Sequence, residues 1–406
     1  MHILVVTQYF WPENFRINDI VTGLHQRGHR VTVLTGHPNY PSGQFTHGYT
    51  GRQVQIEQFS GIRVLRVPML ARGQRSGARL MMNYMSFALM GSLLGPMVAR
   101  DRYDVIFVYE PSPMTVGYPA MVMKWLTGRP IVFYVQDLWP ESLAATGFVT
   151  HTAALKAVEW MVKGIYKACD RILVTSRAFI PRVQRLGVSP NRIGYFPQYA
   201  ESLYRPLAPE PDWARQQGLP EGFTVMFAGN MGTAQDLMTV LEAAEILREE
   251  TINWIFLGDG SMRTELESEA YKRNLTSALF LGSRPASEMP RFFAQADALL
   301  VSLTSDELFA LTVPAKLQSY LACGRPILAS LLGEGAEIVR EAGAGVTCEP
   351  QNAQRLAEAV LVLRQLSQDQ REAMGLRGRA YFEAHFERES LLNDLEQTLR
   401  QAGGRV

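Results

Sequence analysis

The sequence predicts an α/β protein built from two Rossmann-like domains. Its 406 residues are too many for one ordinary domain and suit two of nearly equal size. Apolar residues make up 47% of the chain, which is enough to form a core in each half. Short apolar runs alternate with helical patterns in both halves, and strands separated by helices pair in parallel, with helices covering both faces of the sheet.

The first half keeps this alternation from its first residues onward. Strands are predicted at 3–7, 30–34, 64–67, 105–109, 131–135 and 171–174. Ile17, Ile20, Val21 and Leu24 recur with the period of a helix, and Gly28 follows as its end signal. Further helices are predicted at 80–99, 115–126 and 154–168. Together these elements give a first domain of residues 1–195.

The second half begins after a segment rich in proline and aromatic residues, 195–213, which we interpret as the link between the domains. Strands are then predicted at 224–228, 254–257, 279–281, 298–301 and 327–329, and helices at 237–247, from 261 onward and at 353–363. The second domain therefore covers residues 205–380. The last segment, 381–406, contains a helical stretch at 381–399 that we expect to cross back to the first domain.

Composition and charge exclude several classes of protein. The net charge is +1 and no basic block occurs, which argues against a nucleic-acid-binding protein. Cys169, Cys323 and Cys348 lie far apart, which suits a reducing cytoplasm and gives no metal-ligand pattern. The first residues read as a strand rather than as a signal peptide, so we expect a cytoplasmic protein.

The uncharged run 80–99 is long enough to span a bilayer by length alone. A span here would separate the first strands from their partners in the same sheet, and Asn83, Ser86 and Pro96 weaken it further. We therefore expect a buried helix or one that leans on the membrane. The preceding Arg72, Arg75 and Arg79 either contact anionic lipid or form an ordinary solvated loop.

The stretch 311–330 carries a cation at a favourable place for binding an anion. Pro314 opens a predicted helix, Lys316 lies on its first turn, and Gly324 follows its end. At a helix start, unpaired N–H groups and the helix dipole favour a negative charge. Alone, such a lysine is usually just a solvated side chain.

Glycine-containing turns follow three predicted strands of the second half. They are Gly229-Asn230-Met231-Gly232-Thr233, Gly258-Asp259-Gly260 and Gly282-Ser283-Arg284. Glycines at strand ends let backbone amides approach a phosphate, so three such turns indicate a nucleotide lying across the sheet edge. The alternative is that they are plain strand-to-helix turns.

In the first half, the turn after the first strand lacks G-x-G-x-x-G, which disfavours a dinucleotide enzyme. Asn14 and Arg16 in this turn are candidates to hydrogen-bond a polar ligand, or else Arg16 is simply solvated. Asp137 and Glu141 follow the strand 131–135. A carboxylate at the end of a buried strand is costly unless it is functional or bonded as a cap, and we favour function for Asp137.

Sequence motifs along the whole chain resemble a known family of enzymes. FLGDGSMRTELE, LFLGSRPASEMP and YLACGRPILAS resemble the donor domain of glycosyltransferase family four, whose members are retaining enzymes of GT-B fold. QYFWPENFRI, GHPNYPSG, VQDLWPES, FAGNMGTAQDL and VPAKLQSYLACGRP resemble its bacterial branch for O-antigen and colanic-acid assembly. Within that branch, the resemblance is nearest to transferases of L-fucose and N-acetyl-L-fucosamine.

The sequence departs from the family pattern at several functional positions. Leu311 and Ser319 stand where the family has two glutamates, and Asn230 and Gln235 stand where it has an Arg and Lys clamp on the donor diphosphate. Gln136 replaces an acceptor-side histidine. Lys316 is therefore the best-placed remaining cation, with Arg284 or Arg325 as others. Gln318 or Ser319 would replace the glutamate that binds the donor ribose.

The resemblance implies transfer of a sugar, with retention, from a UDP- or GDP-sugar to a polyprenyl-diphosphate-linked oligosaccharide at the inner face of the cytoplasmic membrane. No metal or cofactor is expected. Catalytic roles are predicted for Asp137, Lys316 and Glu307; donor binding for Gly229, Asn230, Gly232, Thr233, Gly258, Gly260, Arg284, Lys316, Gln318 and Ser319; and acceptor binding for Asn14, Arg16 and Glu141. The alternatives are a nucleotide-sugar epimerase, another GT-B enzyme without a lipid acceptor, and a non-catalytic two-domain binding protein.

Overall fold

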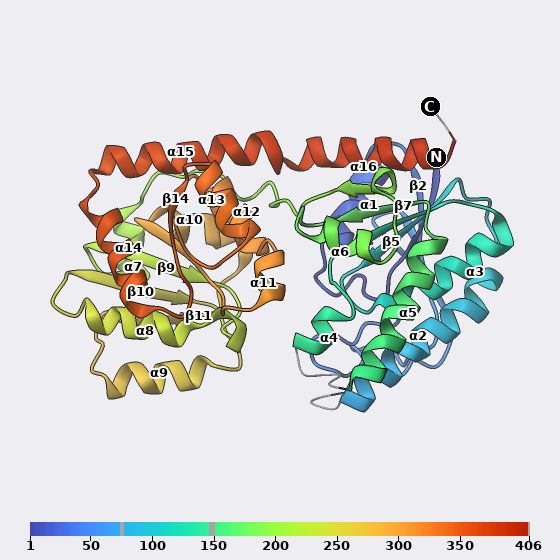
Figure 1. Ribbon diagram of the computed structural model, residues 1–406, viewed down its shortest axis with the longest axis horizontal. Helices are drawn as coiled ribbons and strands as arrows, with labels where there is room; N and C mark the ends of the chain where they lie inside the picture. Colours follow the sequence, from blue (N-terminus) through green and yellow to red (C-terminus); the bar gives the residue numbers. More distant parts are fainter. Residues whose placement is uncertain (74–76, 146–150, 405–406) are drawn as a thin grey trace. The chain divides into compact units, whose positions relative to one another are not determined.

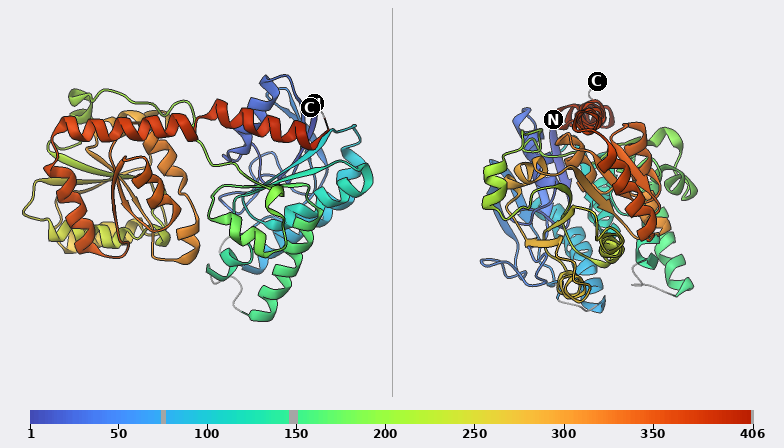
Figure 2. Two further views of the ribbon diagram at one scale, coloured as in Figure 1. Left: turned by 45° about the horizontal axis from the view of Figure 1, so that its top comes forward. Right: turned by 90° about the vertical axis from the view of Figure 1, so that its left-hand side faces the viewer.

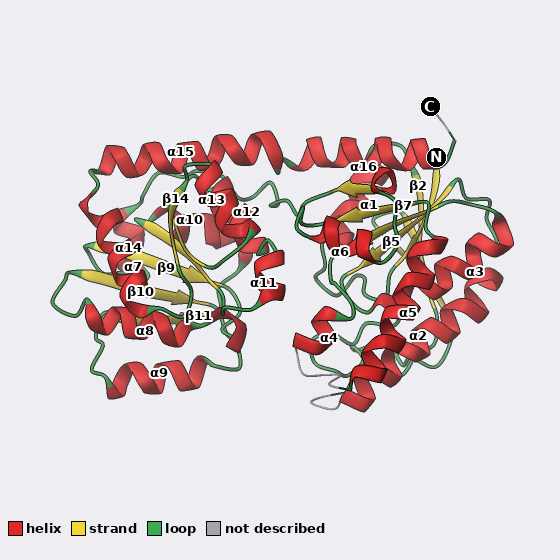
Figure 3. Cartoon of the chain, viewed as in Figure 1, coloured by secondary structure: helices red, strands yellow, loops and turns green. Residues whose placement is uncertain are grey.

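The computed structural model describes residues 1–73, 77–145 and 151–404. Its contacts divide the chain into two compact units, Met1–Pro197 with Leu391–Val406, and Gln198–Ser390. Each unit has a sheet with helices on both faces (Figures 1 and 3). The predicted α/β fold with two Rossmann-like domains is therefore confirmed.

In the described part of the first unit, eight strands form a sheet in the order β3-β4-β2-β1-β5-β6-β7-β8. β3 runs antiparallel to β4, and the other neighbours are parallel. The strands are β1 (His2–Val6), β2 (Arg30–Thr35), β3 (Gln55–Phe59), β4 (Ile62–Arg66), β5 (Val105–Glu110), β6 (Ile131–Val135), β7 (Arg171–Val174) and β8 (Ile193–Tyr195). Every residue of β1, β5 and β6 is buried, as expected for central parallel strands.

Helices cover both faces of this sheet, as the two rotated views in Figure 2 also show. They are α1 (Ile17–Gln26), α2 (Gly77–Val98), α3 (Gly117–Thr127), α4 (Glu141–Ala145), α5 (Thr152–Ala168), α6 (Phe179–Arg185) and α16 (Arg388–Ala402). α2, α3 and α5 follow one another on the same side of the sheet (Figure 1).

Residues 198–390, all of them described, form a parallel sheet in the order β11-β10-β9-β12-β13-β14. Its strands are β9 (Phe223–Ala228), β10 (Ile252–Leu257), β11 (Ala278–Gly282), β12 (Ala298–Ser302), β13 (Ile327–Ser330) and β14 (Gly345–Cys348). The helices are α7 (Pro211–Gln216), α8 (Leu237–Ile246), α9 (Arg263–Lys272), α10 (Met289–Ala294), α11 (Glu307–Leu311), α12 (Ala315–Ala322), α13 (Glu334–Glu341), α14 (Ala353–Gln365) and α15 (Gln368–His385).

The strands that the sequence did not predict all lie at sheet edges. The predictions for 131–135 and 171–174 coincide with β6 and β7. β3, β8 and β14 were missed, and each is the last strand on its side of a sheet. Their residues are partly exposed, with a pattern in β3 that alternates between intermediate and exposed. An edge strand buries less of its surface, so it does not need the continuous apolar run that marks a central strand.

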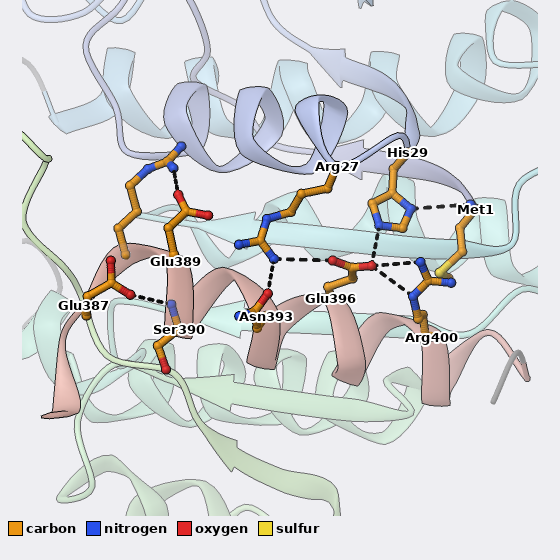
Figure 4. A network of polar contacts seen from close by, with 10 residues as sticks. Met1, Arg27, His29, Glu387, Glu389, Ser390, Asn393, Glu396 and Arg400 are labelled. Carbon is orange, nitrogen blue, oxygen red and sulfur yellow. Dashed lines mark hydrogen bonds and ion pairs between the residues drawn. The ribbon is translucent and has the colours of Figure 1, made fainter. Parts of the chain in front are cut away.

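The prediction of one continuous terminal helix at 381–399 is wrong, because two helices share this stretch. α15 ends at His385 and α16 begins at Arg388. The leucines of α16 that face the first unit, Leu391, Leu392, Leu395 and Leu399, are buried. Glu396 lies at the centre of a polar network with His29 (3.1 Å), Arg27 (3.4 Å) and Arg400 (2.8 Å), drawn in Figure 4. These contacts attach the end of the chain to α1 and the turn after it.

α2 is the predicted apolar helix, and it is anchored in the first unit by polar groups. The fully buried Asn83 donates to the carbonyl of Leu70 (2.6 Å) and accepts from the Gln8 amide (2.7 Å). On its other side the helix exposes a line of apolar side chains: Met82, Met85, Leu89, Leu93 and Met97. Among the described residues, none of the helices combines the length and hydropathy required to cross a bilayer. Of the three arginines before α2, Arg75 lies outside the described residues.

Candidate functional site

In the second unit, the predicted donor residues gather at the carboxyl edge of the sheet. All six strands of residues 198–390 are parallel, so the loops after β9, β10, β11 and β12 lie along one edge. The loop after β9 carries Gly229, and the segment after β12 carries α11 and α12. Hydrogen bonds join neighbouring loops, including one from Thr304 N to Ala234 O (2.9 Å).

Lys316 lies on the first turn of α12, as predicted, but Pro314 stands one residue earlier than expected. Pro314 occupies the N-cap with ψ of 129° and not the first helical position. The Lys316 amine lies 3.9 Å from the centroid of the Phe227 ring on β9. A Cβ atom added to Gly229 would lie 3.5 Å from the same amine, so the glycine leaves room for the lysine.

The environment of this amine is unusual for a lysine. The residue as a whole is partly exposed, but its Nζ atom is buried and has no hydrogen-bond partner within the described structure. Burial lowers the pKa of Lys316 from its ordinary 10.5 to about 7. A buried cation without a partner is costly, and a bound anion would remove that cost. Lys316 therefore has the properties of an anion-binding group.

Two of the predicted phosphate-binding glycines are explained by contacts between loops. A Cβ atom on Gly258 would lie 2.0 Å from the carbonyl oxygen of Gly229, and one on Gly260 would lie 2.4 Å from that of Met231. The same loops are joined by a bond from Met231 N to Asp259 O (2.8 Å). Glycine is thus required at 258 and 260 by the close packing of two backbone segments.

The other predicted groups of the loop after β9 are arranged around Gln235. Its Oε1 atom accepts from the N–H of Gly232 (3.0 Å) and lies 3.5 Å from the Asn230 amide. The N–H of Gly232 is therefore already used within the loop. Asn230 and Thr233 are exposed at the sheet edge.

Gln318 and Arg325 are engaged in contacts within the fold. Gln318 is fully buried, and the amide orientation that satisfies its hydrogen bonds donates to the carbonyls of Pro314 and Ala315, both at 3.0 Å. Arg325 donates to the carbonyl of Ala294 and precedes β13, so it lies at the amino edge of the sheet, opposite Lys316. Neither side chain is presented to the candidate donor site.

The remaining predicted donor residues are on the surface. Glu307 is exposed at the start of α11, next to Asp306, which caps that helix by accepting from Leu308 N (2.7 Å). Arg284 is exposed, with its guanidinium 5.8 Å from the Phe292 ring centroid. Ser319 is partly exposed on α12.

The first unit contains a pocket of about 420 Å³ at the carboxyl end of its own sheet. The structure brings Asp137 into this pocket, together with residues of the loops after β1 and β5 and of α2. The lining residues are Tyr9, Phe15, Tyr40, Arg72, Leu80, Tyr84, Pro111, Ser112, Asp137, Ser142 and Leu143. Asn14, Arg16 and Glu141 are not among them.

Asp137 is the acidic group of the pocket. Burial raises the pKa of Asp137, and the polar side chains of Ser142, Trp139 and Ser112 act in the opposite direction. Its neighbour Glu110, the last residue of β5, has no exposed surface. Burial and the proximity of Asp137 raise the pKa of Glu110 well above its ordinary value, although the backbone amides of Asp137, Gln136 and Ser112 face it. Burial thus favours the protonated form of Glu110, next to the Asp137 side chain that lines the pocket.

The three predicted acceptor residues lie around this pocket and not in its wall. Asn14 is exposed. Arg16 is partly buried beside Tyr109, and its charge opposes the burial that raises the pKa of Tyr109 to about 12. Glu141 is the first residue of α4 and partly exposed. The sequence did not single out Glu110, although it ends the buried strand β5, and Asp137 lies just after the buried strand β6.

Both units match known protein families. Residues 14–198 match the family described as glycosyl transferase 4-like domain, and residues 222–365 match the family described as glycosyl transferases group 1. The glycosyl transferase WcaI of Escherichia coli K12, assigned to colanic acid biosynthesis, is 26% identical over 337 residues, which are 80% of this chain and 82% of that protein.

Solved structures resemble the whole chain. Sucrose-phosphate synthase from Thermosynechococcus elongatus has a TM-score of 0.76 at 18% identity, with 100% of this chain and 99% of that chain covered. HepE from Anabaena, solved in complex with UDP, has a TM-score of 0.72 at 15% identity, with coverage of 99% and 100%. At these identities the likeness establishes the fold.

Proposed function

Because the chain belongs to the nucleotide-sugar-dependent glycosyltransferases of family four, with the two domains of the GT-B fold, we propose that it transfers one sugar to a polyprenyl-diphosphate-linked oligosaccharide. The donor would be a UDP- or GDP-sugar, and L-fucose or N-acetyl-L-fucosamine is the proposed sugar. The product would enter a cell-surface polysaccharide, in line with the colanic acid assignment of WcaI. The observation that carries the proposal is the buried, unpartnered amine of Lys316 beside Gly229.

On the donor side, the proposal assigns the diphosphate to Lys316. A diphosphate beside the amine would restore the ammonium form and supply the charge partner that it lacks. The solved complex of HepE with UDP, in a protein of the same fold, supports a nucleotide of this kind. The exposed Asn230, Thr233 and Glu307 and the partly exposed Ser319 remain candidates for the ribose and the sugar.

For the chemical step we propose retention by substitution on the face from which the leaving group departs. The leaving diphosphate would help to take the proton of the acceptor hydroxyl, so the main demand is stabilisation of the developing charge on the phosphate. Lys316 would supply that charge. Asp137 would orient the acceptor hydroxyl in its pocket, and no metal is needed for either role.

The lipid-linked acceptor is supported by the exposed face of α2. Met82, Met85, Leu89 and Leu93 are each about half exposed, and they recur every three or four residues along one side of the helix. A soluble protein rarely presents such a line unless it binds a partner or a membrane. We propose that this face lies on the inner surface of the cytoplasmic membrane, where a polyprenyl-linked acceptor would be found.

The test is a transfer assay with the full-length protein. UDP- and GDP-sugars are first compared by thermal shift, because a ligand of the native state stabilises by mass action. The stabilising nucleotide sugar is then incubated with a polyprenyl-diphosphate saccharide and with EDTA. The expected result is a glycosylated lipid with retained anomeric configuration, formed in the presence of EDTA. Formation of an altered free nucleotide sugar without any acceptor would instead establish an epimerase, and loss of activity with EDTA would contradict metal independence.

A further inference from the structure

We propose that the pocket of the first unit is the acceptor subsite and that Arg72 binds a phosphate attached directly to the acceptor sugar. This inference rests on the proposed glycosyl transfer and specifies which residues select its acceptor. The pocket of about 420 Å³ is near the lower end of the range for small-ligand sites, roughly 300–1,000 Å³. Its size suits one or two sugar units rather than a long oligosaccharide.

One wall of the pocket is aromatic. Tyr9 and Phe15 are stacked with their ring centroids 5.0 Å apart. Tyr40 contacts both, at 5.9 Å from Tyr9 and 5.3 Å from Phe15. Rigid rings with a few polar groups are the usual lining of a small-molecule site, and they offer a flat apolar surface to the face of a sugar ring.

Arg72 is a pre-positioned cation at this wall. Its guanidinium lies 5.2 Å from the Tyr40 ring centroid, and Nη1 donates to the Tyr9 hydroxyl (3.4 Å). Its backbone N–H donates to Asn39 (2.9 Å), which is joined to the buried Asn83 (3.3 Å). Within the described part of the chain, the guanidinium of Arg72 uses one of its donors, toward the Tyr9 hydroxyl, so most of its planar donors remain for a phosphate.

The acid and the cation of the pocket are connected through Tyr84. Burial raises the pKa of Tyr84, and the charge of Arg72 and the hydroxyl groups of Ser112 and Tyr9 oppose that rise. Tyr84 therefore lies near Ser112, which also acts on Asp137, and near Tyr9, which accepts from Arg72. The pocket therefore presents a carboxylate at one side and a guanidinium at the other. A sugar 1-phosphate matches this arrangement, with its phosphate at Arg72 and a hydroxyl at Asp137.

The experiment measures binding to the full-length protein by ligand-observed NMR and calorimetry. N-acetylglucosamine 1-phosphate is compared with N-acetylglucosamine, and UDP is measured separately as the ligand of the second unit. The wild type is expected to bind the sugar phosphate about tenfold or more tightly than the neutral sugar, because a charge-assisted hydrogen bond to a phosphate is involved. Arg72→Gln should remove this preference and leave UDP affinity unchanged.

Arg52→Gln is the matched control, because Arg52 is an exposed arginine of the same unit outside the pocket. It should retain the full preference. Arg72→Lys is a second variant, to be used if Arg72→Gln does not fold. It keeps the charge but not the planar fork of donors, so its preference for the sugar phosphate should be reduced. Equal binding of the two sugars by the wild type, or an unchanged preference in Arg72→Gln, would overturn the inference. Failure of the donor proposal would look different: the sugar phosphate would bind, but neither UDP nor GDP would.

Discussion

The amine of Lys316 lies 3.9 Å from the centroid of the Phe227 ring, so a residue of α12 covers a residue of β9 at the carboxyl edge of the second sheet. The ring face attracts a cation, but it replaces only part of the hydration that burial removes. As a result the free protein holds this lysine near the midpoint of its titration at neutral pH. Binding of an anion and protonation of Lys316 are therefore coupled.

Replacing Lys316 by alanine should abolish sugar transfer. A positioned charge on a leaving phosphate typically contributes about 10²–10³ in rate, and no other described cation is buried at this edge of the sheet. The fold should persist, because the amine has no hydrogen-bond partner to lose. Turnover of the nucleotide sugar and circular dichroism measure the two effects. Lys272→Ala, at an exposed lysine of α9, is the control and should keep full activity; unchanged activity of Lys316→Ala would disprove the assignment.

The affinity for UDP should fall as the pH rises above 7. In the free protein Lys316 loses its proton with a pKa of about 7, and a diphosphate binds the protonated form. Each further pH unit should therefore weaken binding by up to about tenfold. Calorimetry between pH 6.5 and 9 gives the profile. A Lys316→Met variant should bind more weakly but with no such slope, and a slope that persists in this variant would assign the proton to another group.

The stability of the second unit should rise with pH, whereas the affinity for UDP should fall. The unfolded chain holds the Lys316 proton up to its ordinary pKa of 10.5, whereas the folded chain releases it near 7. Between these values the unfolded state binds more protons, so the free energy of unfolding rises with pH by about 1.4 kcal/mol per unit relative to Lys316→Met. Urea titrations followed by the fluorescence of buried Trp254 measure the difference. A difference that is constant from pH 7 to 9 would contradict the lowered pKa.

Replacing Glu110 by glutamine should stabilise the first unit at neutral pH. The pKa of Glu110 is raised in the folded state by burial, so above its ordinary value of 4.5 the unfolded chain releases a proton that the folded chain keeps. The wild type therefore loses stability as the pH rises above 4.5, by about 1.4 kcal/mol for each unit of the shift. Glu110→Gln has no proton to release and should melt higher than the wild type at pH 8.

The comparison for Glu110 needs two further measurements. At about pH 3.5, one unit below the ordinary pKa of 4.5, the wild type and Glu110→Gln should melt at similar temperatures, because the acid is then mostly protonated in both states. Glu159→Gln, which removes one partner of an exposed i,i+4 ion pair on α5, should change the melting temperature little at either pH. A difference between wild type and Glu110→Gln that does not depend on pH would show that Glu110 is ionised in the folded protein.

A Leu89→Glu, Leu93→Glu double variant should lose binding to anionic vesicles. Both leucines are exposed on α2, at 58% and 59%, and a charge on that face would have to enter the lipid boundary. Sedimentation with vesicles of phosphatidylglycerol and phosphatidylethanolamine measures the bound fraction. Leu376→Glu, at a leucine of α15 that is 61% exposed, is the control and should bind as the wild type does. Equal binding of all three proteins would contradict the proposal that α2 lies on the membrane surface.

The sequence reveals those candidate residues that lie at the start of a helix or at the end of a strand, because these positions can be predicted from local patterns. Lys316 was found because it lies on the first turn of a helix, and Asp137 because it follows a buried strand. The same reasoning failed to identify Glu110, since a strand assigned one residue too short hides its last side chain. Arg72 lies in a loop before an apolar helix, and nothing in the local sequence indicates its contact with Tyr9, 63 residues earlier in the chain.

Local sequence patterns are sufficient to predict the α/β alternation, the division into two Rossmann-like units and the helix that carries Lys316. These features depend on hydrophobic periodicity and on helix start and stop signals, which act over a few residues. Which side chains contact one another was seen only in the folded chain. The fold shows that residue 258 must be a glycine because its backbone packs against Gly229, and that the Gln318 amide donates to carbonyl groups at the start of its own helix. It also shows that Arg72 and Asp137 line the same pocket. Such contacts join distant parts of the chain through strand order and loop packing, and no local pattern encodes them.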